Sequence, residues 1–246
     1  MKIKDAAIIT ARTSSKRLPD KTIMKINGKN TIDFTIERAK KTGYPVILAT
    51  SNDKSDDILE EIAKEHDIHI FRGSLPNKIK RCHDCFNEFS INNALLIEGA
   101  DIGYDYDIAK RSMNKLKKTN SDIIWCPEEI ITGLFTLAMN KSGIKELYSF
   151  VLDENEDTDV FTHLFKKMNA NVDFIELNEN EKNEEIRLTI DYKEDLEFFR
   201  KLYNKFSSTE KSSTMIEYLI QNPSLTKINY FREKDYLDNK KKFMMN

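Results

Sequence analysis

The feature that most constrains the fold of this chain is a short apolar run near its N-terminus. Residues 6–10 read Ala-Ala-Ile-Ile-Thr, and a polar loop follows them directly in place of a second alternating strand. An apolar run of this length without alternation is typical of a parallel strand that is buried on both faces of a sheet. We therefore expect the first central strand at residues 6–10.

Two βαβ units are predicted after this strand. Asn30 can cap a helix that ends at Gly43, before strand character resumes at residues 46–50. A second helix follows Ser55 and leads to a strand at residues 68–71. Two consecutive units of this kind indicate a parallel, Rossmann-like sheet. The apolar stripes of the two helices are formed by Ile32, Ile36 and Ala39, and by Ile58, Leu59, Ile62 and Ala63.

The rest of the chain extends this sheet and adds further helices. The polar stretch 178–185 is expected to be a solvated loop. We predict an α/β fold with a mixed, mainly parallel central sheet. Its further strands are expected at residues 94–97, 122–125, 134–139, 172–177 and 186–190. The helices are marked by Ala109, Met113 and Leu116, by Ile144, Leu147 and Val151, and by Phe161, Leu164 and Phe165.

The length of the chain favours one domain. Its 246 residues are enough to bury one sizeable core, and neither a repeat nor a domain-length linker interrupts them. We expect a single domain over residues 1–246, with a core at roughly residues 6–206 and a helical extension at residues 207–246. An apolar helix around Met215 is predicted in the extension. The sequence leaves open whether the extension packs on the core or mediates a homodimer.

Charge and composition limit the classes of partner. The 39 basic and 41 acidic residues nearly balance, so no net field favours nucleic acid or an anionic membrane. The N-terminal apolar stretch is far too short for a signal peptide or a membrane span. Three cysteines are too few for a disulfide framework. These observations indicate a cytoplasmic protein with a small-molecule ligand.

The segment that carries chemistry is the loop at the end of the first strand, residues 10–21. Small residues alternate there with cations, at the carboxyl edge of a sheet where α/β proteins place ligands. A triphosphate needs close backbone N–H groups and fixed cations, which this loop could supply through Arg12, Arg17 and Lys21. The alternative is a solvated basic loop without a ligand.

Further motifs follow this loop in a recognisable order. Ile-Ile-Thr-Ala-Arg with Ser15, Arg17-Leu18-Pro19 and Lys21 precedes Phe71-Arg72-Gly73-Ser74, then Glu98-Gly99-Ala100-Asp101, and then residues 190–196, Ile-Asp-Tyr-Lys-Glu-Asp-Leu. Over roughly residues 6–206 these motifs resemble the cytidylyltransferases that activate acidic sugars. The likeness is closest to the spore-coat polysaccharide subgroup, kin of the enzymes making CMP-activated ketodeoxyoctonate and sialic acids. It implies a Rossmann-like nucleotidyltransferase domain of the GT-A type.

The resemblance implies a reaction and a set of binding residues. The acceptor oxyanion attacks the α-phosphorus of CTP, and pyrophosphate leaves. The acceptor would be a small anionic molecule such as a sugar acid. The family's N-terminal loop wraps the nucleotide phosphates, so by match the nucleotide-binding residues here are Thr10, Ala11, Arg12, Ser15, Arg17 and Lys21, with Arg72 and Ser74 near the cytidine.

The resemblance also implies a magnesium ion. Asp191 follows the predicted strand 186–190 and matches the family aspartate that ligates Mg²⁺, whereas Asp195 reads as a solvated or capping acid. The catalytic residues would be Arg17, Lys21, Asp101 and Asp191, with the last two as metal ligands.

This chain departs from the family pattern at two positions. Ala100 stands where the family has its other metal-binding acid, and Asp101 is the next residue. Three outcomes stay open. Asp101 and Asp191 both coordinate the metal, or the triphosphate and water supply most of its ligands, or catalysis is lost. Asp20 replaces a usual glycine, and it can adopt the left-handed backbone that the turn requires.

Several other motifs compete with this interpretation. Asp105-Tyr106-Asp107 resembles the metal-binding D-x-D of glycosyltransferases, although these acids also suit a helix N-terminus. Cys82 and Cys85 have redox or zinc spacing, but no second ligand pair accompanies them, so we read them as structural. Arg187 and His163 are candidates for the border of the acceptor site. The acidic stretch 156–159 matches relatives, with helix capping by Thr158 as the alternative.

Overall fold

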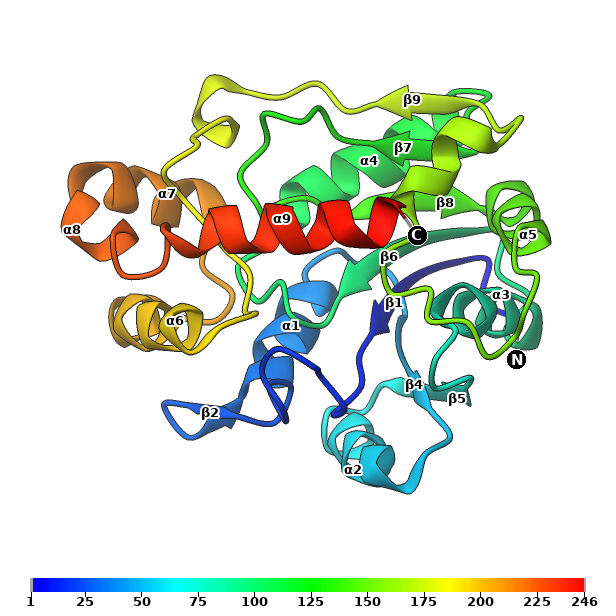
Figure 1. Ribbon diagram of the computed structural model, residues 1–246, viewed down its shortest axis with the longest axis horizontal. Helices are drawn as coiled ribbons and strands as arrows, with labels where there is room; N and C mark the ends of the chain where they lie inside the picture. Colours follow the sequence, from blue (N-terminus) through cyan, green and yellow to red (C-terminus); the bar gives the residue numbers. More distant parts are fainter. Residues whose placement is uncertain (1, 246) are drawn as a thin grey trace.

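A seven-stranded sheet forms the centre of the computed structural model, which describes residues 2–245 and the side chains as far as Lys241 (Figure 1). Pairs that involve β8 are antiparallel, and the other described pairs of this sheet are parallel. The expected α/β fold with a mixed, mainly parallel sheet is therefore confirmed. In spatial order the strands are β5 (His69–Gly73), β4 (Val46–Ser51), β1 (Asp5–Thr10), β6 (Asn93–Glu98), β8 (Leu137–Asn140), β7 (Ile123–Trp125) and β9 (Val172–Phe174).

The first predicted strand is β1, at the centre of the parallel part between β4 and β6. Its side chains alternate between the two faces of the sheet. Ala7 and Ile9 belong to the hydrophobic core on one face, and Ala6 and Ile8 belong to the core on the other. Because both faces are buried, residues 6–9 of the strand are all apolar, which is why the sequence shows no alternation.

Helices cover both faces of the sheet. The apolar sides of α1, α2, α4, α6 and α7 pack in one core, and those of α3 and α5 pack in the other. Asn30 caps α1 in a capping box with Asp33, as the sequence predicted. The helices are α1 (Thr31–Lys40), α2 (Asp57–Glu65), α3 (Lys78–Glu88), α4 (Tyr106–Lys118), α5 (Lys141–Ser149), α6 (Lys193–Lys205), α7 (Ser212–Gln221), α8 (Pro223–Thr226) and α9 (Arg232–Met245), with a small β2/β3 pair (Lys25–Ile26 and Lys29–Asn30) before α1.

One predicted strand, residues 186–190, is not a strand. The segment is extended and buried, but its backbone bonds go to two different loops. The amide of Leu188 donates to the carbonyl of Thr132, and the amide of Ile190 donates to that of Ala100. Only an isolated bridge joins Thr132 to Arg187. The alternating pattern therefore reflects burial between loops and not pairing within the sheet.

Smaller differences concern the second half and one surface position. β8 begins at Leu137 and β9 ends at Phe174, so both are shorter than predicted. The loop 178–185 is not wholly solvated, because Glu181 is buried and binds Arg111 with both carboxylate oxygens. Ile58 was expected on the apolar stripe of α2 but is exposed. Phe161, Leu164 and Phe165 lie at a 3₁₀ helix (Thr162–Lys167) in place of an α-helix, and Val151 lies just beyond α5.

The segment after α6 returns to the body of the protein. In α7, Met215, Ile216 and Leu219 are buried in the hydrophobic core, so this part of the extension packs on the core. In the described residues no helix is both long and apolar enough to cross a membrane. The last helix, α9, crosses the molecule past the carboxyl ends of β1 and β6 (Figure 1).

Candidate active site

Three loops meet at the carboxyl edge of the sheet. The loop after β1 lies next to the loop after β6, because Thr10 pairs with Glu98 and the amide of Gly99 donates to the carbonyl of Thr10 at 3.0 Å. A Cβ atom at Gly99 would lie 2.9 Å from that of Ala11, so only glycine allows this approach. The segment 186–191 joins them through the bond from Ile190 to Ala100. Residues far apart in the chain therefore share one site.

Asp56 fixes the start of the β1 loop. Its Oδ1 accepts from the amide of Thr13 at 2.7 Å and from the Thr13 hydroxyl at 2.8 Å. Its Oδ2 accepts from Thr50 and Ser51 of β4. Burial alone would raise the pKa of Asp56, but these hydrogen bonds hold it below its usual range. Asp56 was not predicted as a site residue, because an acidic residue directly before an amphipathic helix is usually an N-cap.

The turn of the loop places two cations over one carboxylate. Asp20 has φ 57°, the left-handed conformation expected of it. On the two sides of this residue, Arg17 Nη2 lies 2.5 Å from Asp191 Oδ1, and Lys21 Nζ lies 2.9 Å from the same oxygen. Burial alone would raise the pKa of Asp191, but Lys21, Arg17 and Arg187 hold it well below its usual range. Three of the four predicted catalytic residues are thus in direct contact.

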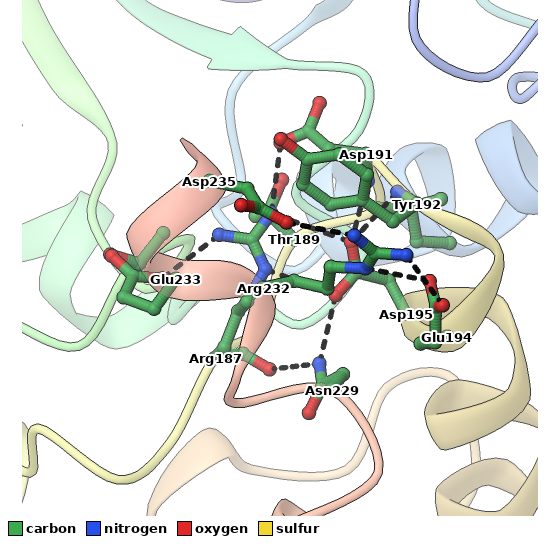
Figure 2. A network of polar contacts seen from close by, with 12 residues as sticks. Arg187, Thr189, Asp191, Tyr192, Glu194, Asp195, Asn229, Arg232, Glu233 and Asp235 are labelled. Atoms are coloured by element: carbon green, nitrogen blue, oxygen red, sulfur yellow. Dashed lines mark hydrogen bonds and ion pairs between the residues drawn. The ribbon is translucent and has the colours of Figure 1, made fainter. Parts of the chain in front are cut away.

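Arg187 ties Asp191 to its surroundings (Figure 2). Its guanidinium is fully buried and donates to Asp191 at 3.1 Å, to Asp195 at 3.0 Å and to Glu233 at 2.9 Å. Asp195 also accepts from the amides of Asp191 and Tyr192 and so caps α6. Asp195 was predicted to be either a solvated or a capping acid. It is a capping acid, and its side chain is buried. Arg187 is engaged in ion pairs.

Asp101 completes the predicted set from the loop after β6. Burial raises the pKa of the Asp101 carboxyl to about 7, and the charges of Glu98 and Asp191 act in the same direction. Burial is the main cause of this shift, and the hydrogen bond with Thr189 and the charge of Lys21 oppose it. Among the described residues, no group of three or more acidic, histidine or cysteine side chains is arranged to hold a metal. Two carboxylates nevertheless fit Mg²⁺, which commonly takes one or two together with phosphate and water.

A second cluster of cations lies beside the same loop. Arg12 lies 3.7 Å from Asp159 and 3.9 Å from Asp157, and Lys16 binds Asp157 at 2.8 Å. The acidic stretch 156–159 therefore meets the basic loop directly. Thr158 accepts from the amide of Ile79 at the start of α3, so it caps a helix distant in sequence.

Two further cations of this cluster come from α3. Lys78 is buried and binds Glu98 at 2.5 Å, at the end of β6. Arg81 is buried and donates to the carbonyl of Ser74 at 2.8 Å, whereas its Nε has no partner. Neither Lys78 nor Arg81 was predicted from the sequence to lie at the site. Their signal was two cations three positions apart on the face that also carries Ile79 and Cys82, since exposed helix charges would lie on the opposite face.

Arg72 and Ser74 are not brought to the centre of the site. Arg72 pairs with Asp57 and Glu60 of α2 and donates to two backbone carbonyls before that helix. Ser74 accepts from the amide of Asn77, next to the start of α3. Thr10 and Ala11 are buried at the base of the loop, and Ser15 approaches the amide of Leu18 within the loop.

The competing motifs have structural explanations. Asp105 accepts from the amides of Asp107 and Ile108 and is the N-cap of α4. Cys82 and Cys85 are buried in the core beside α3, where burial raises the pKa of each thiol. His163 lies in the 3₁₀ helix at 162–167, where burial lowers its pKa.

Comparisons with known proteins identify the family to which the chain is similar. The model of one family, described as cytidylyltransferase, matches residues 6–222. The chain is 24% identical over 226 residues to the spore coat polysaccharide biosynthesis protein SpsF of Bacillus subtilis, covering 88% of this chain and 94% of that protein. It is 28% identical over 151 residues to the 3-deoxy-manno-octulosonate cytidylyltransferase of Wigglesworthia glossinidia brevipalpis, covering 60% and 59%. A cytidylyltransferase structure from Leptospira borgpetersenii superposes with a TM-score of 0.82 at 24% identity, covering 91% and 97%.

Proposed function

The chain belongs to the cytidylyltransferase family of nucleotidyltransferase enzymes, and we propose that it transfers CMP from CTP to an anionic sugar-acid acceptor, releasing pyrophosphate. The observation that carries the proposal is the contact of Arg17 and Lys21 with one oxygen of Asp191. Both cations come from the loop after β1 and lie at the ligand-binding edge of the sheet. Without a ligand they neutralise a buried carboxylate, and a triphosphate would compete with that carboxylate for them.

The cations of the loop after β1 and the two acids of the site would have different roles. Arg17 and Lys21 would bind phosphate oxygens and stabilise the charge that develops at the α-phosphorus. Arg12 would contribute a third cation from the same loop. A Mg²⁺ ion held by Asp101 and Asp191 would supply charge neutralisation at the phosphates. The acceptor oxyanion forms a bond to the α-phosphorus while the bond to the bridging oxygen breaks, and pyrophosphate carries away the electron pair.

The names of two relatives bear on the chemical class of the acceptor. The relatives' names refer to a spore-coat polysaccharide and to 3-deoxy-manno-octulosonate. Both are consistent with an acidic sugar as acceptor. A reaction of this kind supplies activated sugars for polymer synthesis. We propose that the enzyme acts on CTP in the cytoplasm.

One observation favours a second candidate, a nucleotide-binding homologue with impaired catalysis. Ala100 carries no carboxylate at the position of the family's metal ligand, and Asp101 has its pKa raised to about 7 by burial and by nearby acids. If Asp101 cannot replace the missing ligand, the loop would bind nucleotide without turnover. The glycosyltransferase alternative has lost support, because Asp105 is engaged as a helix cap.

Thermal unfolding with single nucleotides tests the proposal. CTP, UTP, GTP and ATP are added separately, each with and without Mg²⁺. A ligand at about 100 times its dissociation constant stabilises a protein by roughly 2.7 kcal/mol. For a chain of this size 1 kcal/mol raises the unfolding midpoint by about 2–4 °C, so this stabilisation corresponds to a rise of roughly 5–11 °C. A rise with CTP alone, followed by pyrophosphate release that requires a sugar acid, supports the proposal; a rise with UTP alone contradicts it. CTP binding without release under any acceptor favours the second candidate.

A further inference from the structure

The C-terminal helix α9 lies against the candidate active site but outside the part of the chain that the family model matches. The match ends at residue 222, and α9 spans Arg232–Met245. Figure 1 shows the helix crossing the carboxyl ends of the central strands, and Figure 2 shows its first turn at the Arg187 network. The helix therefore lies beyond the residues that the family model matches and next to the proposed site.

Polar contacts attach α9 to the protein. Glu233 binds the Arg187 guanidinium at 2.9 Å and accepts from the Thr132 hydroxyl at 2.7 Å. Arg232 binds Glu194 of α6 through two nitrogens at 2.8 and 3.1 Å. Two residues before the last described side chain, Asn239 donates to the Tyr192 hydroxyl at 3.2 Å. These contacts reach the segment 187–195 that carries Asp191.

Apolar burial contributes little to this attachment. Among the residues of α9 whose side chains the structure describes, 232–241, none belongs to either hydrophobic core. Leu237 is 42% exposed on the outer side of the helix. By contrast, Met215 and Leu219 of α7 are fully buried. Elements outside the core open at lower free energy than elements that share it, and added salt weakens the more exposed Arg232–Glu194 pair, whose side chains are 31% and 28% exposed.

Tyr236 brings α9 to the phosphate-binding cations. Its ring lies 5.8 Å from the Arg17 guanidinium and 4.7 Å from that of Arg187. It is also near enough to both acids of the site that their charges act on its hydroxyl, in addition to its burial. Tyr236 thus lies beside the cations that would bind a triphosphate, and α9 in this position restricts access to Arg17, whose side chain is 31% exposed.

We propose that α9 is a lid over the active site, latched by the ion pair between Glu233 and Arg187. The proposal rests on the function proposed above. When the lid opens, Arg187 keeps Asp191 and Asp195 as partners, so the site itself stays assembled. Binding of phosphates to Arg17 and Lys21 then frees Asp191, and the lid closes over the ligand.

Cys126 offers a natural probe of lid opening that needs no nucleotide. The thiol is 9% exposed, and the charge of Lys240 in α9 acts on it. Because Lys240 lies near enough for its charge to act on the thiol, we expect opening of α9 to increase the exposure of Cys126 to a thiol reagent. Cys82 and Cys85 are 1% and 0% exposed beside α3, so they provide internal references. The experiment measures the rate of Cys126 modification in the full chain by peptide mass spectrometry, with and without 0.5 M NaCl, roughly five times the ionic strength at which the Debye length is 10 Å.

The latch variant is Glu233→Gln, and Asp238→Asn on the exposed side of the same helix is its matched control. We expect Glu233→Gln to accelerate Cys126 modification about tenfold, the factor for loss of one charge-assisted hydrogen bond, with the control unchanged. Salt should accelerate the wild type in the same direction. Rates that do not respond to the variant or to salt would show that α9 is a fixed wall and overturn the proposal.

A second arm connects opening to ligand access. CTP with Mg²⁺ should associate faster with Glu233→Gln than with the wild type or the control. Faster modification of Cys126 with unchanged association would show that opening does not gate the site, and the lid would be rejected. If CTP binds to none of the proteins, the proposed function fails. Inorganic triphosphate then replaces CTP in the same comparison and decides the lid separately.

Discussion

Arg17 Nη2 lies 2.5 Å from Asp191 Oδ1 although the two residues are 174 positions apart. The contact joins the loop after β1 to the segment before α6, and Lys21 reaches the same oxygen. A buried carboxylate with a pKa far below its usual range keeps its charge, so the cations remain positioned. The electrostatic arrangement of the site therefore exists before any ligand binds.

The first prediction concerns these two cations. Arg17→Ala and Lys21→Ala should each weaken CTP binding by about tenfold or more, because each removes a charge-assisted contact to phosphate. Isothermal titration calorimetry measures the change. Lys16→Ala is the matched control, since its side chain is 72% exposed and pairs with Asp157 at the surface. Unchanged affinity in both variants would refute the assignment of the loop to phosphate binding.

The second prediction concerns Asp191. Asp191→Asn should reduce Mg²⁺-dependent turnover by roughly 10–100-fold, the range found when metal-site carboxylates are disturbed. Nucleotide binding without metal should change less, because the substitution also removes a competitor for Arg17 and Lys21. Steady-state pyrophosphate release and metal-free calorimetry separate the two effects. Full activity in the variant would exclude Asp191 as a ligand.

Asp107→Asn serves as the companion to that experiment. Asp107 is exposed at the first turn of α4, and its carboxylate contacts Lys110. Under the cytidylyltransferase proposal the variant keeps its turnover. A selective loss of activity here, with Asp191→Asn unaffected, would instead point to a glycosyltransferase that uses Asp105 and Asp107.

The third prediction restores the family acid. Ala100→Asp should raise turnover or lower the Mg²⁺ concentration needed for half-maximal activity, by roughly severalfold for one added carboxylate ligand. Ala100 is only partly buried, so the longer side chain has space. Activity is measured across a Mg²⁺ titration. The same titration of Asp101→Asn identifies which acid binds: if neither substitution changes the metal dependence, the metal is held mainly by phosphate.

The local pattern of the sequence predicted the parallel half of the fold. β1, β4 and β6 are largely buried on both faces, and each therefore appears as an apolar run between turn residues, whereas β5 at the edge of the sheet is only partly buried. Prediction failed at residues 186–190, where an alternating pattern arises from loops on either side. Periodicity reports which side chains are buried, but it does not report which backbone buries them.

The site residues also fall into those that the sequence predicted and those that it did not. A likeness in sequence located Arg17, Lys21, Asp101 and Asp191, and the structure brings them to one edge of the sheet. Tyr236 and Glu233 were not predicted, because a charged C-terminal helix carries no sign of its docking partner. Arg81 and Lys78 were missed for a related reason: a buried cation and a surface cation look alike in a single sequence.

The last prediction concerns Asp56, which supports the loop through Thr13. Asp56→Asn should destabilise the protein by about 1–3 kcal/mol at pH 7, because buried donors lose a charged acceptor. The folded pKa of Asp56 lies below its unfolded value of about 3.9. Its contribution is therefore full above pH 4 and is lost as pH falls through the folded pKa. Urea unfolding at pH 6 and pH 3 should show a smaller pH dependence in the variant than in the wild type, whereas exposed Asp53→Asn should lose little stability. An equal pH dependence in wild type and Asp56→Asn would show that another acid dominates.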